Sequence, residues 1–217
     1  MRSSHISLET DMDVVYRSLL IWSLTLLSAL TAHAQNLIDT MYAKVMESHV
    51  ELVYSYSFRI SGVNNIGQGI LSAQDDLWHV DGNGIQMWCD GSSMWVVDPS
   101  LKEVVIEPAV LEADYLSNPA LLFTRMDDCF NVRMARSSAD GDTMLYVLEP
   151  KHSGDIDYCN IEVFKDDASI KSATFAMTDG NLLNIEVSSM TFSPKRPQTS
   201  FRPQTSFDSS WIVTDLR

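Results

Sequence analysis

The feature that most constrains the fold is a run of three short apolar segments joined by two tight turns, between Ile85 and Pro108. Asp-Gly and Asp-Pro turn signals separate the segments, so we predict strands at Ile85–Cys89, Met94–Val97 and Lys102–Glu107. Gly91 tolerates the positive φ of a hairpin turn, and Pro99 fixes φ in the second turn. Trp88 and Trp95 flank the first turn, so this hairpin carries a large apolar surface.

The alternation of apolar runs and turn residues continues on both sides of this run. It predicts further strands at Leu52–Ile60, Ile66–Ala73, Leu77–Val80, Phe130–Met134, Thr143–Glu149, Ile156–Lys165, Ile170–Met177, Leu182–Phe192 and Trp211–Leu216. Turns join most of them, which indicates an antiparallel meander and not βαβ units. The pattern favours an α+β, mainly β fold with one large, curved antiparallel sheet of about eleven strands. At Gly67 and Gly69 we expect a bulge or a strong bend.

Two segments interrupt the β pattern and are predicted to be helical. Residues Asn36–Val50 carry a wide apolar stripe opposite polar side chains, with Asn36 as a suitable N-cap. Residues 110–126 include a second helix start, at Asn118 followed by Pro119. We expect both helices to cover the open, concave side of the sheet.

The N-terminus has the pattern of an export signal. Arg17 precedes an apolar run that is too short to span a bilayer, and Ala32-His33-Ala34 matches an A-x-A cleavage site. We therefore expect a cleaved signal peptide at residues 1–34 and a mature domain at 35–217 that is exported from the cytoplasm. A buried helix is the alternative, and translation could begin at Met12, because the acidic residues before it do not suit a signal peptide.

Charge and cysteine content limit the partners and the chemistry. The formal net charge is −14, so the surface repels nucleic acids and anionic membranes, and we expect no nucleic-acid partner. An oxidising compartment would permit one disulfide among Cys89, Cys129 and Cys159, with one thiol left over. No C-x-x-C pair is present, which argues against a zinc site, and buried apolar packing is the simplest role for these cysteines.

An exact tandem hexapeptide, RPQTSF-RPQTSF, occupies residues 196–207. Pro197 and Pro203 exclude a central strand here, because proline cannot donate a ladder hydrogen bond. Two copies are too few to bury a core of their own, so we predict a solvent loop lengthened by duplication. A proline-rich binding motif is the alternative.

No catalytic constellation is apparent. The motifs G-x-S-x-G, H-E-x-x-H, G-x-x-x-x-G-K and G-x-G-x-x-G are absent, and His49, His79 and His152 are isolated from one another in sequence. The pairs Asp140-x-Asp142 and Asp155-x-Asp157 lack the glutamate of an EF-hand loop. We therefore expect neither an enzyme nor a bound metal or cofactor.

Aromatic side chains are the remaining signal. They either pack a solid core or line a cavity for an apolar ligand, and the sequence leaves both alternatives open. For the second alternative, the candidate ligand-binding residues from the strands and from the second helix are Tyr54, Tyr56, Phe58, Trp78, Trp88, Trp95, Tyr146, Leu121, Leu122 and Phe123.

Several motifs, in order, resemble the LolA family of periplasmic lipoprotein carriers. These are Gly67-Gln68-Gly69, the hairpin from Asp90-Gly91 through Trp95 to Asp98-Pro99, Asn118-Pro119 where the lid helices of the family begin, Leu148-Glu149-Pro150, and the C-terminal segment from Phe207 to Arg217. The C-terminal segment is similar to that of Bacteroidetes-type members. The resemblance spans the whole mature chain.

The resemblance implies an unclosed β-barrel capped by helices, with an apolar cavity for lipoprotein acyl chains or another lipid. It also implies a monomeric carrier that moves its cargo toward the outer membrane, an inner-membrane lipoprotein-releasing ABC transporter as donor, and an outer-membrane acceptor. A non-enzymatic envelope sensor on the same fold and a secreted β-protein with a solid core remain as alternatives.

The sequence departs from the family at three places. Ala73-Gln74-Asp75-Asp76 stands where well-known members carry a basic segment whose arginine is linked to holding the lid. Ser92 replaces the hairpin lysine and Val97 the tyrosine. A different cargo or a different opening mechanism would follow.

Overall fold

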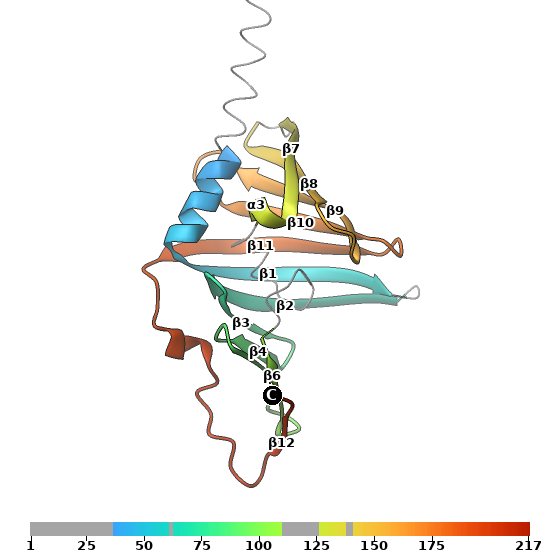
Figure 1. Cartoon of the computed structure of the whole chain (residues 1–217). Helices are drawn as coiled ribbons and strands as arrows, with labels where there is room; N and C mark the ends of the chain where they lie inside the picture. The colour runs from blue at the N-terminus through green and yellow to red at the C-terminus, as the bar shows by residue number, and fades with distance from the viewer. Residues whose placement is uncertain (1–36, 61–62, 110–125, 138–140) are drawn as a thin grey trace, which may run out of the picture.

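The computed structural model describes residues 37–60, 63–109, 126–137 and 141–217. Within these residues, twelve strands form one sheet in the order β12-β6-β5-β4-β3-β2-β1-β11-β10-β9-β8-β7 (Figure 1). Their bounds are β1 His49–Ile60, β2 Val63–Gln74, β3 Leu77–Gly82, β4 Ile85–Cys89, β5 Ser93–Asp98, β6 Glu103–Pro108, β7 Phe130–Ser137, β8 Thr143–Pro150, β9 Ile156–Phe164, β10 Ile170–Met177, β11 Leu182–Ser193 and β12 Ile212–Asp215. β12 and β7 are the two edges, so hydrogen bonds do not close the sheet.

Two meanders make up eleven of the twelve described strands and meet at the centre of the sheet. β1 to β6 pair in sequence order, and so do β7 to β11, each with its neighbour antiparallel. The pairing of β1 with β11, from His49–Ser193 to Phe58–Leu183, joins the two meanders. The prediction of an α+β, mainly β fold with an unclosed sheet is therefore confirmed, with twelve strands in place of about eleven.

One strand departs from the predicted antiparallel pattern. β12 pairs parallel with β6, Val213 opposite Val104. A parallel neighbour needs a crossover connection, because a tight turn reverses the chain. Residues 194–211, here called the C-terminal strap, supply this crossover from the end of β11 to the far edge of the sheet (Figure 1).

The register assigns every strand residue to one of two faces. Residues directly opposite on paired strands share a face, and successive residues alternate between faces. On one side of the sheet, Leu52 is opposite Leu71 and Ala173 is opposite Ile161. These side chains pack in the clusters that include the N-terminal helix, so we call this side the helix face. The other side of the sheet is called the strap face. There, His79 is opposite Trp88, Trp88 is opposite Trp95, and Trp95 is opposite Ile106.

The N-terminal helix covers the helix face. Its described residues are 37–47, shorter than the predicted Asn36–Val50, because Ser48 forms a bend and His49 already pairs with β11. Ile38 and Met41 pack with Tyr146 and Phe175 in one buried cluster. Val45 packs with the β1–β4 side of the sheet in a second cluster. The apolar stripe thus spans both meanders. The other predicted helix, 110–126, falls outside the described residues apart from Met126, where α3 (Met126–Cys129) begins.

The tandem hexapeptide forms no strand and most of its residues are exposed, as predicted, but it is not a free loop, because its two phenylalanines are packed. Phe201, at the end of the 3-10 helix η1 (Gln198–Phe201), is 1% exposed, and its ring centroid lies 5.8 Å from that of buried His49. Phe207, its counterpart in the second copy, contacts Trp211 edge to face at 5.0 Å. Val97, Val104 and Ile106 form a third buried cluster on the strap face, and the rings of Phe207 and Trp211 pack against it. Each copy therefore anchors the strap at a different place.

Asp90 ties the first hairpin turn to the strap. Its buried Oδ1 accepts hydrogen bonds from the backbone N–H groups of Ser92 and Ser93, and its Oδ2 accepts one from Arg202 Nε at 2.6 Å. Burial alone would raise the pKa of Asp90, but these hydrogen bonds outweigh burial and hold the pKa below its usual value. Gln198 also donates to the Asp90 carbonyl.

The three cysteines are free and buried, so no disulfide links them. Cys129 and Cys159 belong to the first cluster and Cys89 to the second. Burial raises the pKa of the Cys89 and Cys159 thiols, which keeps them protonated. Their role as small buried apolar side chains is confirmed.

Candidate functional site: an apolar cavity

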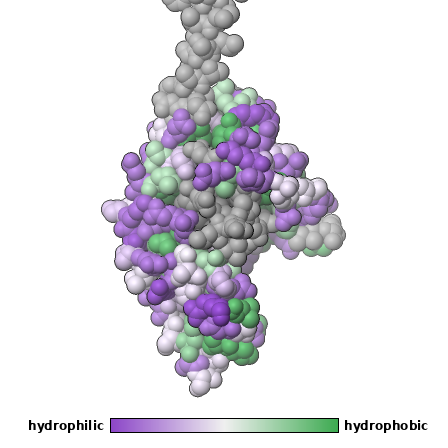
Figure 2. Space-filling model, viewed as in Figure 1, coloured by the Kyte–Doolittle hydropathy of each residue, from purple (hydrophilic) through white to green (hydrophobic). Residues whose placement is uncertain are grey.

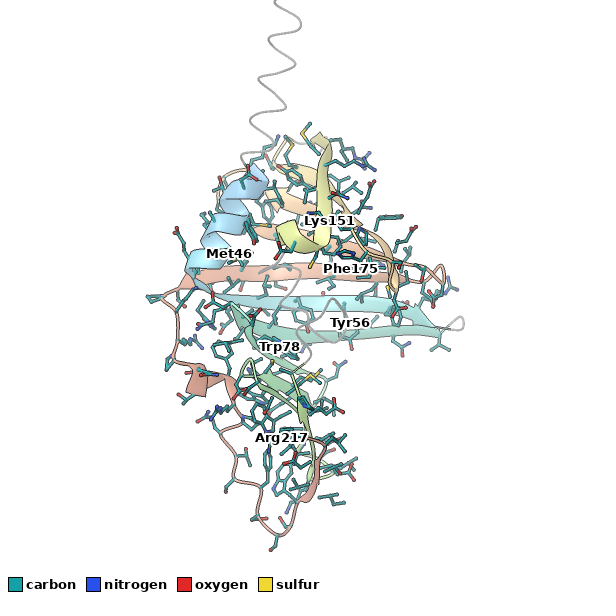
Figure 3. All side chains as sticks on the ribbon, viewed as in Figure 1. Met46, Tyr56, Trp78, Lys151, Phe175 and Arg217 are labelled. Carbon is teal, nitrogen blue, oxygen red and sulfur yellow. The ribbon has the colours of Figure 1, made fainter. Side chains whose placement is uncertain are left out.

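A cavity of about 290 Å³ lies on the helix face, where the two meanders meet. Its lining comes from five strands, as Leu52, Tyr54 and Tyr56 of β1, Leu71 of β2, Ile161 of β9, Ile170, Ala173 and Phe175 of β10, and Leu183, Ile185 and Val187 of β11. Figure 3 labels Phe175 and Tyr56 near the middle of the sheet, where β11 and β1 run side by side. The volume is close to the lower end of the range typical of small-ligand sites, about 300–1,000 Å³.

Cross-strand register explains why the lining is so uniformly apolar. Ala173 is opposite both Ile161 and Ile185, and Phe175 is opposite Leu183. Tyr56 continues the row from Ile185 onto β1. One transverse row of apolar side chains therefore runs across β9, β10, β11 and β1, with the small Ala173 leaving space in its middle.

Two tyrosines border the cavity on the β2 side. Tyr54 is opposite Gly69 and Tyr56 is opposite Gly67. The β1–β2 pairing keeps one register throughout, so the predicted bulge at the glycines is absent. The ring centroids lie 6.5 Å apart, and Asn83 Nδ2 donates a hydrogen bond to the Tyr56 hydroxyl. Burial raises the pKa of Tyr54, so its phenol is neutral at physiological pH.

The other predicted helix-face aromatics lie beside the cavity. Trp78 is 1% exposed in the second cluster, and Tyr146 is 1% exposed in the first. Burial raises the pKa of Tyr146 to about 12. Phe58 is half-buried and opposite Leu183, one step further toward the tip of β1. None of the three lines the cavity. The predicted residues Leu121, Leu122 and Phe123 lie outside the described part of the chain.

Trp88 and Trp95 lie on the strap face, across the sheet from the cavity. They are opposite each other on β4 and β5 and pack against the third cluster. The His79 ring stacks on Trp88 with 3.5 Å between centroids. The alternation of side chains along β4 decides this placement, because Met87 and Cys89 face the helix side.

Sequence reasoning missed most of the lining, namely Leu52, Leu71, Ile161, Ile170, Ala173, Phe175, Leu183, Ile185 and Val187. The sequence signal that could have found these residues is the alternation of apolar and polar side chains along β10 and β11. In β11, for example, polar residues separate Leu183, Ile185 and Val187. Aromatic content was a weaker guide than this periodicity, since aliphatic side chains provide most of the surface.

The lining side chains suit an apolar ligand. Among the described residues of the lining, none carries an ionisable group other than the two phenols, and the hydroxyls of Tyr54 and Tyr56 are the side-chain hydrogen-bonding groups. A charged or strongly polar ligand would lose its hydration without compensation there. The arrangement can shelter an alkyl chain and can hydrogen-bond at one border.

Comparison with protein families identifies the group to which the chain belongs. The model described as "Outer membrane lipoprotein carrier protein LolA" matches residues 77–204, more than half of the chain. The chain belongs to the LolA family. That description names a carrier of outer-membrane lipoproteins. A search of curated protein sequences gave no match.

Two solved structures are similar to this chain. An uncharacterized conserved protein from Thermus thermophilus has a similar structure, with a TM-score of 0.55, 11% sequence identity, and coverage of 84% of this chain and 98% of that chain. A LolA superfamily protein from Nitrosomonas europaea matches with a TM-score of 0.43 and 10% identity, over 78% of this chain and 97% of that one. At such identities the first comparison supports the fold alone.

The described helices are all too short or too polar to cross a bilayer. The N-terminal segment with the predicted export signal lies outside the described residues.

Proposed function

We propose that this LolA-family protein is a periplasmic carrier that binds the acyl chains of lipoproteins, or of another lipid, in the cavity on the helix face. The observation that carries the proposal is the continuous apolar lining formed by β1, β2, β9, β10 and β11. An alkyl chain of about 16 carbons costs roughly 12 kcal/mol to expose to water, at about 0.8 kcal/mol per CH₂. A protein that covers this chain lets it cross an aqueous compartment without any covalent step.

Export would precede this role. The predicted signal peptide at residues 1–34 would deliver the domain to the periplasm, where an inner-membrane lipoprotein-releasing ABC transporter would load it and an outer-membrane acceptor would unload it. The family description supports a lipoprotein cargo. The net charge of −14 opposes adsorption to anionic membrane surfaces, which suits a carrier that must leave each membrane again.

The test is binding of a fluorescent fatty-acid probe to the wild type and to a variant with a filled cavity. Ala173→Leu adds a branched side chain in the middle of the apolar row, and we expect at least a tenfold loss of affinity because the added carbons occupy the ligand's space. Ser172→Leu is the matched control, since residue 172 is the neighbour on the opposite face, opposite Glu186 and Glu162.

Cargo identification completes the test. Mass spectrometry of the protein purified from its native periplasm should find acylated peptides or lipids that are depleted in Ala173→Leu and retained in Ser172→Leu. Absence of cargo from the wild type, together with no binding of the fatty-acid probe, would contradict the proposal.

A further inference from the structure

Gly67 and Gly69 occupy the positions on β2 directly under the two tyrosine rings that border the cavity. Each glycine is opposite its tyrosine in the β1–β2 register, Gly67 with Tyr56 and Gly69 with Tyr54. A glycine in a strand interior weakens the strand by itself, and it often marks a place where another group approaches the backbone closely. Here the approaching groups are the rings.

The space above the two glycines is already occupied. A Cβ added at Gly67 would lie 2.7 Å from Tyr56 Cε1 and 2.5 Å from Asn83 Nδ2. A Cβ at Gly69 would lie 2.9 Å from both the Tyr54 hydroxyl and the carbonyl oxygen of Asp81. Such distances are shorter than a carbon–carbon van der Waals contact, so any larger residue displaces the ring. The rings therefore lean over β2 only because residues 67 and 69 lack side chains.

The direction of that lean determines the width of the cavity. Tyr56 has β2 on one side and β11, with Ile185 directly opposite, on the other. Ile185 is part of the cavity lining. A ring that cannot lie over Gly67 has to adopt another of the few staggered side-chain rotamers, and we infer that it turns toward Ile185. It would then occupy the cavity.

We propose that Gly67 and Gly69 set the ligand capacity of the cavity, by holding the rings of Tyr56 and Tyr54 over β2 and out of the ligand's space. This inference rests on the proposed function, and it makes Gly67 a specificity-determining residue for the length of the bound alkyl chain. The hydrogen bond from Asn83 to the Tyr56 hydroxyl holds the ring in the open position from the far side.

Gly67→Ala is the variant of choice. The atoms that its Cβ would meet are the ends of two side chains, which can move, whereas a Cβ at Gly69 would also meet the β3 backbone. Gly154→Ala is the matched control, because a Cβ there meets nothing within 4 Å. In Tyr56→Val with Gly67→Ala, the ring is absent, so the added methyl group has nothing to push into the cavity.

The experiment measures binding of saturated fatty acids of increasing length, by displacement of the fluorescent fatty-acid probe from the wild type and the three variants. We expect Gly67→Ala to bind the short acids like the wild type and to lose about fourfold in affinity for each methylene group that no longer fits. Gly154→Ala should match the wild type at every length. The double variant should regain the long acids, which a misfolded protein could not do.

Two results would overturn the inference. If Gly67→Ala shows the wild-type length profile, the glycine does not set the capacity, while the proposed carrier function survives. If the double variant fails to regain long acids although Gly67→Ala has lost them, the ring is not what excludes the chain. A wild type that binds no fatty acid of any length contradicts the carrier function and this inference together.

Discussion

Asp90 shows how one buried residue can join segments that are far apart in the chain. Its carboxylate is 1% exposed, yet it accepts hydrogen bonds from its own turn and from Arg202 of the strap. Asp98, at the start of the next turn, makes the same local hydrogen bonds to Ser100 and Leu101 and has no arginine partner among the described residues. The two aspartates differ mainly in burial and in this long-range ion pair.

We predict that Asp90→Asn lowers the free energy of unfolding at neutral pH by about 2–3 kcal/mol, because it removes the charge from hydrogen bonds that the buried carboxylate accepts, one of them from the half-exposed Arg202. The folded-state pKa of Asp90 is below its ordinary value of 3.8, so its contribution is complete above that value and disappears as the pH falls through the folded pKa. Urea denaturation at a series of pH values measures both effects.

Asp98→Asn is the control for this experiment, and we expect a smaller loss at neutral pH. A difference between Asp90→Asn and the wild type that persists unchanged into strong acid would show that the charge of Asp90 is not the cause.

At the scale of elements, the two hexapeptide copies attach the strap to the sheet at two different places. Phe201 of the first copy is fully buried against His49, near the start of β1. Both ring nitrogens of His49 lack hydrogen-bond partners among the described residues, and its burial lowers its pKa, so the contact is between a neutral imidazole and an apolar ring. Phe207 of the second copy packs near β6, where β12 begins to pair.

The repeat offers an internal comparison for the strap. Phe201→Ala should cost about 3–4 kcal/mol of stability, since it removes a fully buried aromatic ring. Phe207→Ala should cost less, because Phe207 is half-buried and its loss leaves a site open to water. The five residues before each phenylalanine are the same, so burial is the main variable that thermal or urea denaturation would test. Equal losses at both positions would contradict the division of roles.

At the scale of the whole molecule, the sheet has a centre and two unequal edges. β1, β2 and β11 lie in the middle of the order, whereas β12 and β7 each have one neighbouring strand. Ile212, Val213 and Leu216 are exposed at the β12 edge, where apolar side chains gather at the lower end of the space-filling view (Figure 2). The cavity lies at the centre, on both sides of the junction of β1 and β11.

We predict that amide hydrogen exchange follows this layout. Protection should be highest in β1, β2 and β11 and lowest in β12, since edge strands open locally at a lower free energy than the strands of a core. Exchange measured by mass spectrometry on proteolytic fragments would give the ranking. Protection of β12 equal to that of β1 would indicate that the strap and the sheet unfold as one cooperative unit.

Local signals in the sequence were sufficient for most elements. β4 and β10 have the predicted bounds, and the other strands differ at their ends by a few residues. Turn residues and period-two alternation act over distances of a few residues, so they can be recognised without knowledge of the fold. The same signals predicted Tyr54 and Tyr56, which line the cavity, because they lie on the apolar face of a long strand.

Long-range pairing decided the rest. The sequence by itself determined the strands, the turns, the amphipathic helix and the family. Only the tertiary structure decided that Trp88 and Trp95 face away from the cavity, that β12 returns parallel to β6, and that the hexapeptide copies are anchors. The physical reason is register: a side chain's face and neighbours depend on which residue of a distant strand lies opposite it, and periodicity within one segment does not contain that information.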